Sequence, residues 1–323
     1  MTTELSTTDQ TATLPALADR LEAYGRMAAG AFAGNTEKAR RSDSKVFADW
    51  CVAAGRRSLP ATPETVALFL EDQAGTKTVA TVRRYAASIA HLHRAADVAS
   101  PTATEPVRLA LKRLARTKGT RANQADALTR RSVDRMLDAC PTTLQGLRDA
   151  ALLAVAYDSA CRRSELVAFN VEDVTADDDG AAVALVRRSK TDQEGAGRFV
   201  MLAPDTVARL AAWLSAAAIA DGALFRSVRK GGRSVAADRL HANAVAAIFK
   251  AAARRVGIEA ANVSGHSTRV GMAQDAAALG CSLVEIMQAG GWRSSAMVAR
   301  YSEKVGVRFG AAAKLARAQG RLA

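Results

Sequence analysis

The sequence predicts a mainly α fold of two domains, in which an all-helical N-terminal domain precedes a mostly helical domain with a small antiparallel sheet. Three observations lead to this prediction. Apolar residues recur at helical spacing through the first third of the 323 residues. A polar, basic stretch without an apolar period follows near residue 120. After it, only "AAVALVRRSKTDQEGAGRFVML" has the pattern of two short strands around a polar turn.

The N-terminal domain is expected at residues 14–120, after a Thr-rich, disordered tail at residues 1–13. A helix in "NTEKARRSDSKVFADWCVAAG" has one apolar face and one basic and polar face. The apolar face consists of Val46, Phe47, Trp50 and Cys51. Thr62 and Pro63 supply the N-cap and the first-turn proline of the next helix.

The third helix of this domain, in "KTVATVRRYAASIAHLHRAAD", combines an apolar inner stripe with a basic outer side. The inner stripe consists of Val79, Val82, Ala86, Ile89 and His93. The basic residues towards the outer, N-terminal side are Lys77, Arg83 and Arg84. A further short helix is expected at about residues 107–114.

A linker at residues 121–128 leads to the second domain, which is expected at residues 129–323. Thr129 can cap a helix in "RRSVDRMLDAC". The stretch "GLRDAALLAVAYDSA" is apolar on most sides and predicts a buried core helix. We expect helices to resume at Pro204, after the two strands, and to continue to a last helix at residues 308–322.

Composition indicates a polyanionic partner and a cytoplasmic protein. The chain carries 45 Lys and Arg against 32 Asp and Glu, a net charge of +13. Each phosphate that a basic protein neutralises releases a counterion, although a merely well-solvated surface is the alternative. No apolar run is long enough to predict a membrane span, and the polar N-terminus lacks a signal core. The four cysteines stand far apart, which fits a reduced cytoplasm and predicts no metal site.

The stretch "SGHSTRVGMAQDAAALG", residues 264–280, places His266 and Arg269 at the start of a predicted helix. The free N–H groups and the dipole of a helix start attract anions, and the arginine fork grips two phosphate oxygens. Each residue alone also has a plain explanation, because a histidine can be satisfied by the backbone and an arginine can form a surface ion pair.

Four further places carry polar groups of matching type. "CRRSEL" holds Arg162 with Glu165 one helical turn later, and Lys190 lies at the end of the predicted β-turn. "CSLVEIMQAGGW" contains a Ser-x-x-Glu capping box and a Gly-Gly stop before Trp292. Tyr301 follows nine positions after the tryptophan. Alone, each of these two aromatic residues is more often a core residue than a site residue.

In this order and spacing, Arg162, Lys190, "HSTR", "GGW" and Tyr301 resemble the tyrosine recombinase (phage integrase) family along most of the chain. The resemblance implies a clamp of the two domains around duplex DNA. It also implies site-specific recombination through a 3′-phosphotyrosine link and a Holliday junction at short inverted repeats. The implied partners are double-stranded DNA and further copies of the chain, as a homotetramer on DNA. The resemblance implies no metal, no nucleotide cofactor and no membrane.

The resemblance gives each residue of the pattern a role. Tyr301 is the nucleophile, and Arg162 and Arg269 contact the non-bridging oxygens of the phosphate, where charge rises in the transition state. His266 donates to the same oxygens or assists proton removal from the tyrosine. Trp292 donates its indole N–H to the phosphate.

Lys190 is the implied general acid for the departing 5′ oxygen. Glu165 has no direct role with a phosphate and is expected to orient the arginines and the lysine. Arg163 is a competing candidate for the first arginine. We prefer Arg162 because its three-residue spacing to the glutamate fits the family.

DNA contacts are expected from the third helix of the N-terminal domain and from the stretches "VRKGG" and "DRLHANAVAAIF". The expected DNA-binding residues are Lys77, Arg83, Arg84, Arg229, Lys230, Arg239 and Asn243. Arg239 and Asn243 are four positions apart, which predicts a shared helical face. Asparagine pairs with adenine edges rather than with guanine.

The last helix is expected to dock into a neighbouring protomer through a narrow apolar stripe, with packing on its own domain as the alternative. The stripe consists of Phe309, Ala312, Ala313 and Ala316. Rival functions are a type IB topoisomerase, an integrase that needs accessory factors and a non-catalytic DNA-binding protein. The intact set of polar groups argues against the last of these.

Overall fold

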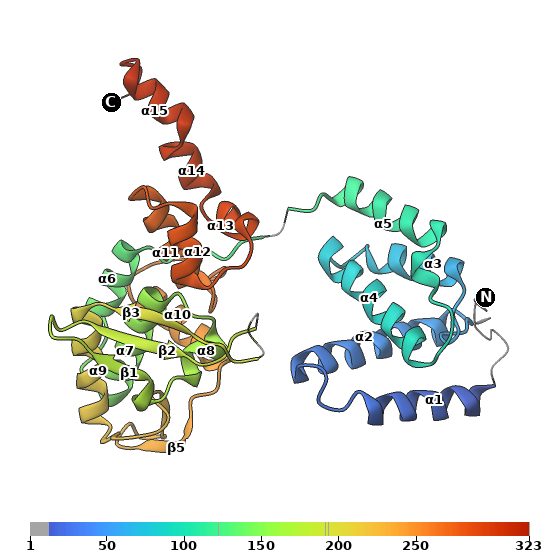
Figure 1. Cartoon of the computed structure of the whole chain (residues 1–323), viewed down its shortest axis with the longest axis horizontal. Coiled ribbons are helices and arrows are strands. Elements are labelled where there is room, and N and C mark those ends of the chain that lie inside the picture. The colour runs from blue at the N-terminus through green and yellow to red at the C-terminus, as the bar shows by residue number, and fades with distance from the viewer. Residues whose placement is uncertain (1–12, 122, 191, 193, 323) are drawn as a thin grey trace, which may run out of the picture. The chain divides into compact units, whose positions relative to one another are not determined.

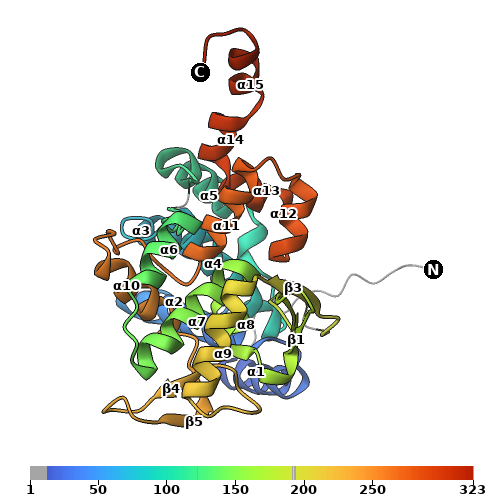
Figure 2. The same cartoon turned by 90° about the vertical axis from the view of Figure 1, so that its left-hand side faces the viewer.

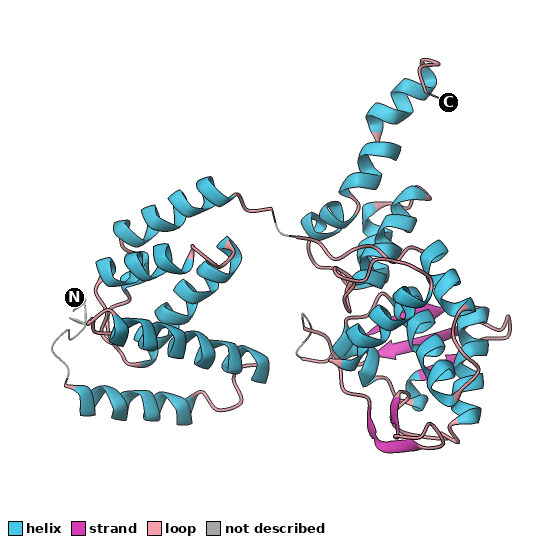
Figure 3. Ribbon diagram, turned by 180° about the vertical axis from the view of Figure 1, so that it is seen from behind, coloured by secondary structure: helices cyan, strands magenta, loops and turns pink. Residues whose placement is uncertain are grey.

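The computed structural model describes residues 13–121, 123–190, 192 and 194–322. The chain divides into two compact units, residues 1–123 and residues 124–323 (Figure 1). All of the described strands lie in the second unit (Figure 3). The mainly helical fold class with a small antiparallel sheet is therefore confirmed. The predicted disordered tail lies outside the described residues except for Thr13.

The N-terminal unit consists of helices packed around an aromatic core. Its elements are α1 (Leu14–Met27), α2 (Gly34–Ala53), α3 (Pro63–Gln73), α4 (Val79–Ala95), the 3-10 turn η1 (Pro101–Ala103) and α5 (Glu105–Lys118). Phe47 on α2 and Phe69 on α3 are fully buried, and their ring centroids lie 5.0 Å apart. The predicted cap of α3 is present, because the Thr62 hydroxyl accepts a hydrogen bond from the Thr65 N–H.

Helix α4 has the two-sided character that the sequence predicts. The inner stripe from Val79 to His93 is buried at each predicted position. The helix begins at Val79 with a threonine cap, so the prediction that Lys77 lies on the helix is wrong. Arg84, on the outer side, donates two hydrogen bonds to the buried carboxylate of Asp43 on α2. This arginine therefore also holds two helices of the unit together.

The second unit is built around α7 (Leu144–Ser159), the helix that the sequence predicts to be buried. Leu152, Leu153 and Val155 on this helix are fully buried. Figure 2 shows α9 running alongside α7. The helices of the unit besides α7 are α6 (Arg130–Asp138), α8 (Arg163–Ala168), η2 (Val171–Asp173), α9 (Pro204–Ala216), α10 (Ala244–Arg255), α11 (Ser267–Ala278), α12 (Leu283–Gly290), α13 (Ser295–Tyr301), α14 (Glu303–Phe309) and α15 (Ala311–Ala318).

A three-stranded antiparallel sheet packs against α7. Its order is β1 (Val174–Ala176), β2 (Ala182–Val186), β3 (Arg198–Leu202), and β2 and β3 are the two predicted strands. A separate hairpin, β4 (Arg226–Val228) and β5 (Val235–Arg239), interrupts the region where we predicted only helices. That prediction is wrong. The strands β1 and β4 are three residues long, which is too short for a visible period of two.

The C-terminal segment forms two short helices instead of the single helix predicted at residues 308–322. Helix α14 ends at Phe309, Gly310 is extended, and α15 spans Ala311–Ala318. Glycine is a poor helix former, which explains the break. Figures 1 and 2 show α15 beyond α14 and away from the sheet of the unit. Of the predicted apolar stripe only Ala313 is buried. Among the helices of the described residues, none is long and apolar enough to span a bilayer.

Candidate active site

Arg162 and Glu165 are held together by a capping box at the start of α8. Arg162 is the N-cap residue, and its Nη1 donates to Glu165 Oε1 at 2.6 Å. The second carboxylate oxygen accepts from the backbone N–H of Arg162 at 3.0 Å. The glutamate is 3% exposed, so the arginine is its main counter-charge. Arg163 is exposed, and its side chain lies beside Gly265 rather than in the ion pair with Glu165, so we keep Arg162 as the first arginine.

Arg269 lies one turn into α11 and is almost completely buried. Its guanidinium donates to the carbonyl of Ala160 and, at 3.2 Å, to that of Gly290. Its Cζ lies 4.6 Å from the centroid of the Trp292 ring, which is cation–π geometry. Burial, followed by the positive charge of Arg162, lowers the pKa of Arg269 to about 10. A nearby anion would relieve this penalty.

His266 is the residue from which α11 starts. Its backbone N–H donates to the Ser264 hydroxyl at 3.1 Å, so the preceding loop is folded back on the helix start. The residue is exposed, yet its pKa is lowered by partial desolvation of the ring and then by Arg269 and Arg162. The imidazole is therefore neutral near pH 7 and keeps one unprotonated ring nitrogen.

Trp292 is presented by the end of α12. The predicted capping box of this helix is present between Ser282 and Glu285, and Gly291 ends the helix in the left-handed region with φ 62°. The indole is 7% exposed and lies edge-on to the Tyr301 ring, with centroids 5.8 Å apart. Arg269, the tryptophan and the tyrosine thus form one continuous stack.

Tyr301 is the last residue of α13 and is half-buried. Its backbone carbonyl accepts hydrogen bonds from the side-chain amides of Gln274, at 3.1 Å, and Gln124, at 3.4 Å. Two separate segments of the unit therefore hold the end of this helix. Sequence reasoning did not find either glutamine, because nothing in the local pattern links them to the tyrosine.

Lys190 lies on the exposed turn between β2 and β3. Close to it, the Asp192 carboxylate accepts from the backbone N–H groups of Gly195, Ala196 and Gly197, which closes the turn. These bonds, with that of Gly197 first, lower the pKa of the aspartate. The contact of the lysine with a scissile phosphate remains a prediction.

Arg198 is a residue near the site that sequence reasoning missed. It begins β3, and its Nη2 lies 3.9 Å from Glu165 Oε2. The strand alternates, with Val200 and Leu202 buried and the residues between them exposed. An arginine in phase with the buried positions was the available signal, because period-two alternation points its side chain towards the core.

The predicted base-reading pair does not share a helix. Arg239 ends β5, whereas Asn243 is the exposed N-cap residue of α10. The Arg239 guanidinium donates to the backbone carbonyl of Phe169 at 2.8 Å, to that of Val167 and to the side chain of Asn170. The prediction of one helical face is wrong, because the spacing of four was read as helical where the chain is a strand and a turn.

The other expected DNA contacts lie on exposed positions. Arg83 is exposed on α4, and Lys77 is exposed just before it. Arg229 and Lys230 lie in the turn between β4 and β5, where the Arg229 N–H donates to the Ser234 carbonyl at 2.9 Å. Their role in DNA binding stays a prediction.

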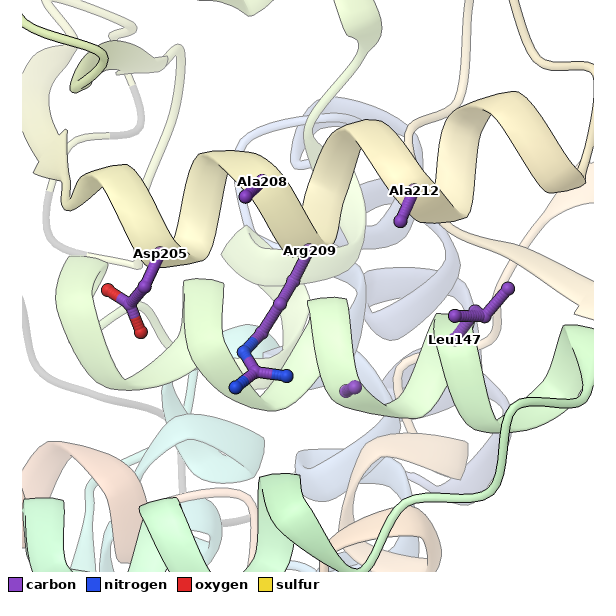
Figure 4. Close-up of a pocket in the computed structure, with 6 residues that line it drawn as sticks. Leu147, Asp205, Ala208, Arg209 and Ala212 are labelled. Atoms are coloured by element: carbon purple, nitrogen blue, oxygen red, sulfur yellow. The ribbon is translucent and has the colours of Figure 1, made fainter.

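A hollow of about 370 Å³ lies elsewhere in this unit, between α7 and α9. Figure 4 shows Arg209 reaching from α9 towards α7 across it. Its lining residues are Leu147, Ala150, Asp205, Ala208, Arg209 and Ala212. None of the seven predicted catalytic residues lines this hollow. The candidate site is separate from this hollow, and it combines the exposed His266 and the half-buried Tyr301 with the buried Arg269.

Comparisons with known proteins identify relatives that match most of this chain. The model of the phage integrase family matches residues 126–305. The chain is 31% identical over 303 residues to the recombinase cre of Escherichia phage P1, covering 88% of each protein. It is 33% identical over 282 residues to an integrase/recombinase xerD homolog of Selenomonas ruminantium, covering 84% of this chain and 82% of that one.

Solved structures show the same fold at low sequence identity. One is a lambda integrase tetramer bound to a Holliday junction, with a TM-score of 0.63 and 17% identity, covering 93% of this chain and 80% of that one. Another is the Tn1549 transposon integrase in complex with circular intermediate DNA, with a TM-score of 0.61 and 13% identity, covering 88% of this chain and 94% of that one.

Proposed function

This chain belongs to the phage integrase family, and from that premise we propose that it cuts and rejoins duplex DNA at short inverted repeats through a 3′-phosphotyrosine link. It is a tyrosine site-specific recombinase, an enzyme that transfers DNA strands. The observation that carries the proposed mechanism is the stack of Arg269, Trp292 and Tyr301 in one unit with the Arg162–Glu165 pair.

The proposed reaction exchanges one phosphodiester for another. The Tyr301 phenol oxygen forms a bond to phosphorus while the bond from phosphorus to the 5′ oxygen breaks. Neutral His266 accepts the phenol proton, and Lys190 gives a proton to the departing 5′ oxygen. The products are a 3′-phosphotyrosine and a free 5′ hydroxyl. Attack by a 5′ hydroxyl from another strand reverses the step, so rejoining needs no nucleotide.

The two arginines act on the charge that builds up at phosphorus. The phosphate carries one negative charge before the step and gains charge in the five-coordinate transition state. Arg269 is desolvated, and its lowered pKa reflects an unfavourable isolated charge. Arg269 therefore stabilises a nearby anion more strongly than an exposed arginine would. This stabilisation grows as the negative charge on the phosphate grows towards the transition state.

The proposed partners are double-stranded DNA and three further copies of the chain. The net charge of +13 supports a polyanion, and the two units would hold the duplex as a clamp. We further propose that α15 docks into a neighbouring protomer, because most of its surface is exposed here. Packing of α15 on its own unit remains the alternative. The cytoplasm is the proposed location.

The experiment uses a binding site recovered from a randomised duplex library. A nicked duplex with that site loses a short fragment after cleavage, which traps the covalent adduct. We expect a protein–DNA adduct with the wild-type chain and none with Tyr301→Phe, at unchanged DNA affinity. Mass spectrometry of the adduct identifies which of the four tyrosines carries the nucleotide.

A matched control is Tyr24→Phe, which also removes one phenol hydroxyl, but from α1 in the other unit. It should leave the adduct unchanged. If Tyr301→Phe still formed the adduct, Tyr301 would not be the nucleophile. Relaxation of supercoiled plasmid without exchange between two sites would favour the topoisomerase alternative, and DNA binding without any adduct would favour a non-catalytic protein.

A further inference from the structure

The guanidinium of Arg198 lies among four parts of the second unit, which are the ends of α7 and α12, the start of α8 and the segment between α7 and α8. Its side chain is 19% exposed, and residue 198 pairs with Val186 across the β2–β3 hairpin. Nη1 donates to the Ala289 carbonyl at 3.0 Å. Nη2 lies 3.5 Å from the Ser159 carbonyl, 3.5 Å from Cys161 Sγ and 3.9 Å from Glu165 Oε2.

These contacts join three helix ends. Ser159 is the last residue of α7, Glu165 lies in the first turn of α8, and Ala289 lies in the last turn of α12. Carbonyls in the last turn of a helix have no partner within the helix, and a cation there also meets the negative end of the helix dipole. The end of α12 is held twice, because Arg269 donates to the next carbonyl, that of Gly290.

The end of α12 decides where Trp292 lies. Gly291 turns the chain with φ 62°, and a Cβ at this position would lie 2.6 Å from Arg198 Nε. The arginine therefore packs directly against the turn that leads into the tryptophan. The tryptophan in turn lies against Arg269 and Tyr301, at 4.6 Å and 5.8 Å.

We propose that Arg198 is a positioning residue for strand cleavage, which fixes the Trp292–Tyr301 segment relative to the Arg162–Glu165 pair. The proposal rests on the proposed function, since it concerns the geometry of that same site. A planar guanidinium can reach the Ala289 carbonyl and the Glu165 carboxylate at the same time, whereas the single ammonium group of a lysine cannot. Arg198 also begins the strand after the turn that bears Lys190, so it joins that turn to the site.

The test compares Arg198→Met and Arg198→Lys with Arg187→Met. Arg187 lies at the other end of the same hairpin turn and pairs with the buried Asp173 at 2.6 Å, away from the site. Cleavage is measured as the single-turnover rate at saturating protein on the nicked duplex. We expect Arg198→Met to slow it about 10- to 100-fold, the scale of a small misplacement of reacting groups. DNA affinity should change by less than about threefold, because most of the Arg198 side chain is covered by the second unit.

The lysine variant separates geometry from charge. It keeps the charge and most of the packing, so it also serves if the methionine variant folds poorly. We expect Arg198→Lys to retain the thermal stability of the wild type and to recover no more than a small part of the cleavage rate. Full recovery of the rate by lysine would show that only the charge matters and would overturn the proposal.

A spectroscopic readout is independent of activity. With fluorotryptophan in place of its three tryptophans, the chain gives one fluorine NMR signal each for Trp50, Trp213 and Trp292. We expect Arg198→Met to shift the Trp292 signal and to leave the other two in place, with Arg187→Met shifting none. An unmoved Trp292 signal would overturn the positioning role. A wild-type chain that forms no DNA adduct would instead overturn the proposed function, whatever the fluorine signals show.

Discussion

Replacing Gly290 by alanine is a sensitive test of whether the Trp292 stack is needed for cleavage. Gly290 is the last residue of α12 and is buried. A Cβ at this position would overlap the six-membered ring of Trp292, well inside van der Waals contact. The indole would have to move, and it is the only group that touches both Arg269 and Tyr301 among the described aromatic contacts.

One stabilising and two destabilising effects decide the outcome. Alanine is favoured over glycine within a helix by about 0.5–1 kcal/mol. Forcing an extra carbon into a packed site costs about 1–3 kcal/mol. A displaced indole also loses its edge contact with Tyr301, worth about 0.5–1.5 kcal/mol. We therefore expect a net loss of about 0.5–4 kcal/mol in the free energy of unfolding. Cleavage should slow by about 10²-fold, because a shift near 1 Å can cost that much.

Chemical denaturation gives the stability, and adduct formation at saturating protein gives the rate. The control is Gly306→Ala on α14, where a Cβ would meet nothing within 4 Å. This change should leave stability equal or raise it by up to about 1 kcal/mol, and half-site cleavage should be normal. If Gly290→Ala behaved like the control in both assays, the placement of Trp292 would not limit the reaction.

Two further predictions concern rate and pH. Arg162→Ala and Arg269→Ala should each slow single-turnover cleavage by at least ~10²-fold with little change in DNA affinity, as expected for lost transition-state donors. A collapse of affinity at a normal saturated rate would make them simple phosphate clamps. His93 accepts the Ala61 N–H at Nε2 and lies against the Ile89 carbonyl, and burial lowers its pKa below 6.5. Its contribution to stability should be complete above about pH 6.5 and fall as the pH drops towards the folded pKa. Urea unfolding between about pH 8 and pH 5, followed by the fluorescence of Trp50 in the N-terminal unit, checks this. If the free energy of unfolding of His93→Gln fell with pH as steeply as that of the wild type, the prediction would be contradicted.

The sequence predicts the fold well where apolar residues form a long pattern. Helix α7 was expected to be buried because nearly all of its faces are apolar, and the inner stripe of α4 was expected from its period. The hairpin β4–β5 was missed, because its strands are short and largely half-exposed. The two strands pair within one local hairpin, but their burial does not alternate along either strand, so no period of two is visible. Gly310 was the visible signal for the break between α14 and α15, and the pattern around it was wrongly continued through it.

The candidate site was predictable only where residues are close in sequence or carry a family pattern. The Arg162–Glu165 pair and the capping box before Trp292 are three-residue spacings, and both are present. Their catalytic roles stay predictions. The pairing of Arg239 with Asn243 was wrong, because a spacing of four is informative only once the segment is known to be a helix.

Three arginines that bind helix ends show why charge and spacing alone are a poor guide to such a site. Arg269 donates to carbonyls at the ends of α7 and α12, Arg198 donates at the end of α12, and Arg239 donates at the end of α8. Helix ends expose carbonyls that lack intrahelical partners, and the arginine fork satisfies them from a distant part of the chain. Each of these arginines counts towards the net charge of +13, yet part of its hydrogen-bonding capacity is used inside the fold. The net charge therefore overstates the number of groups that are available to DNA, and only the three-dimensional contacts distinguish an arginine that builds the site from one that binds the phosphate.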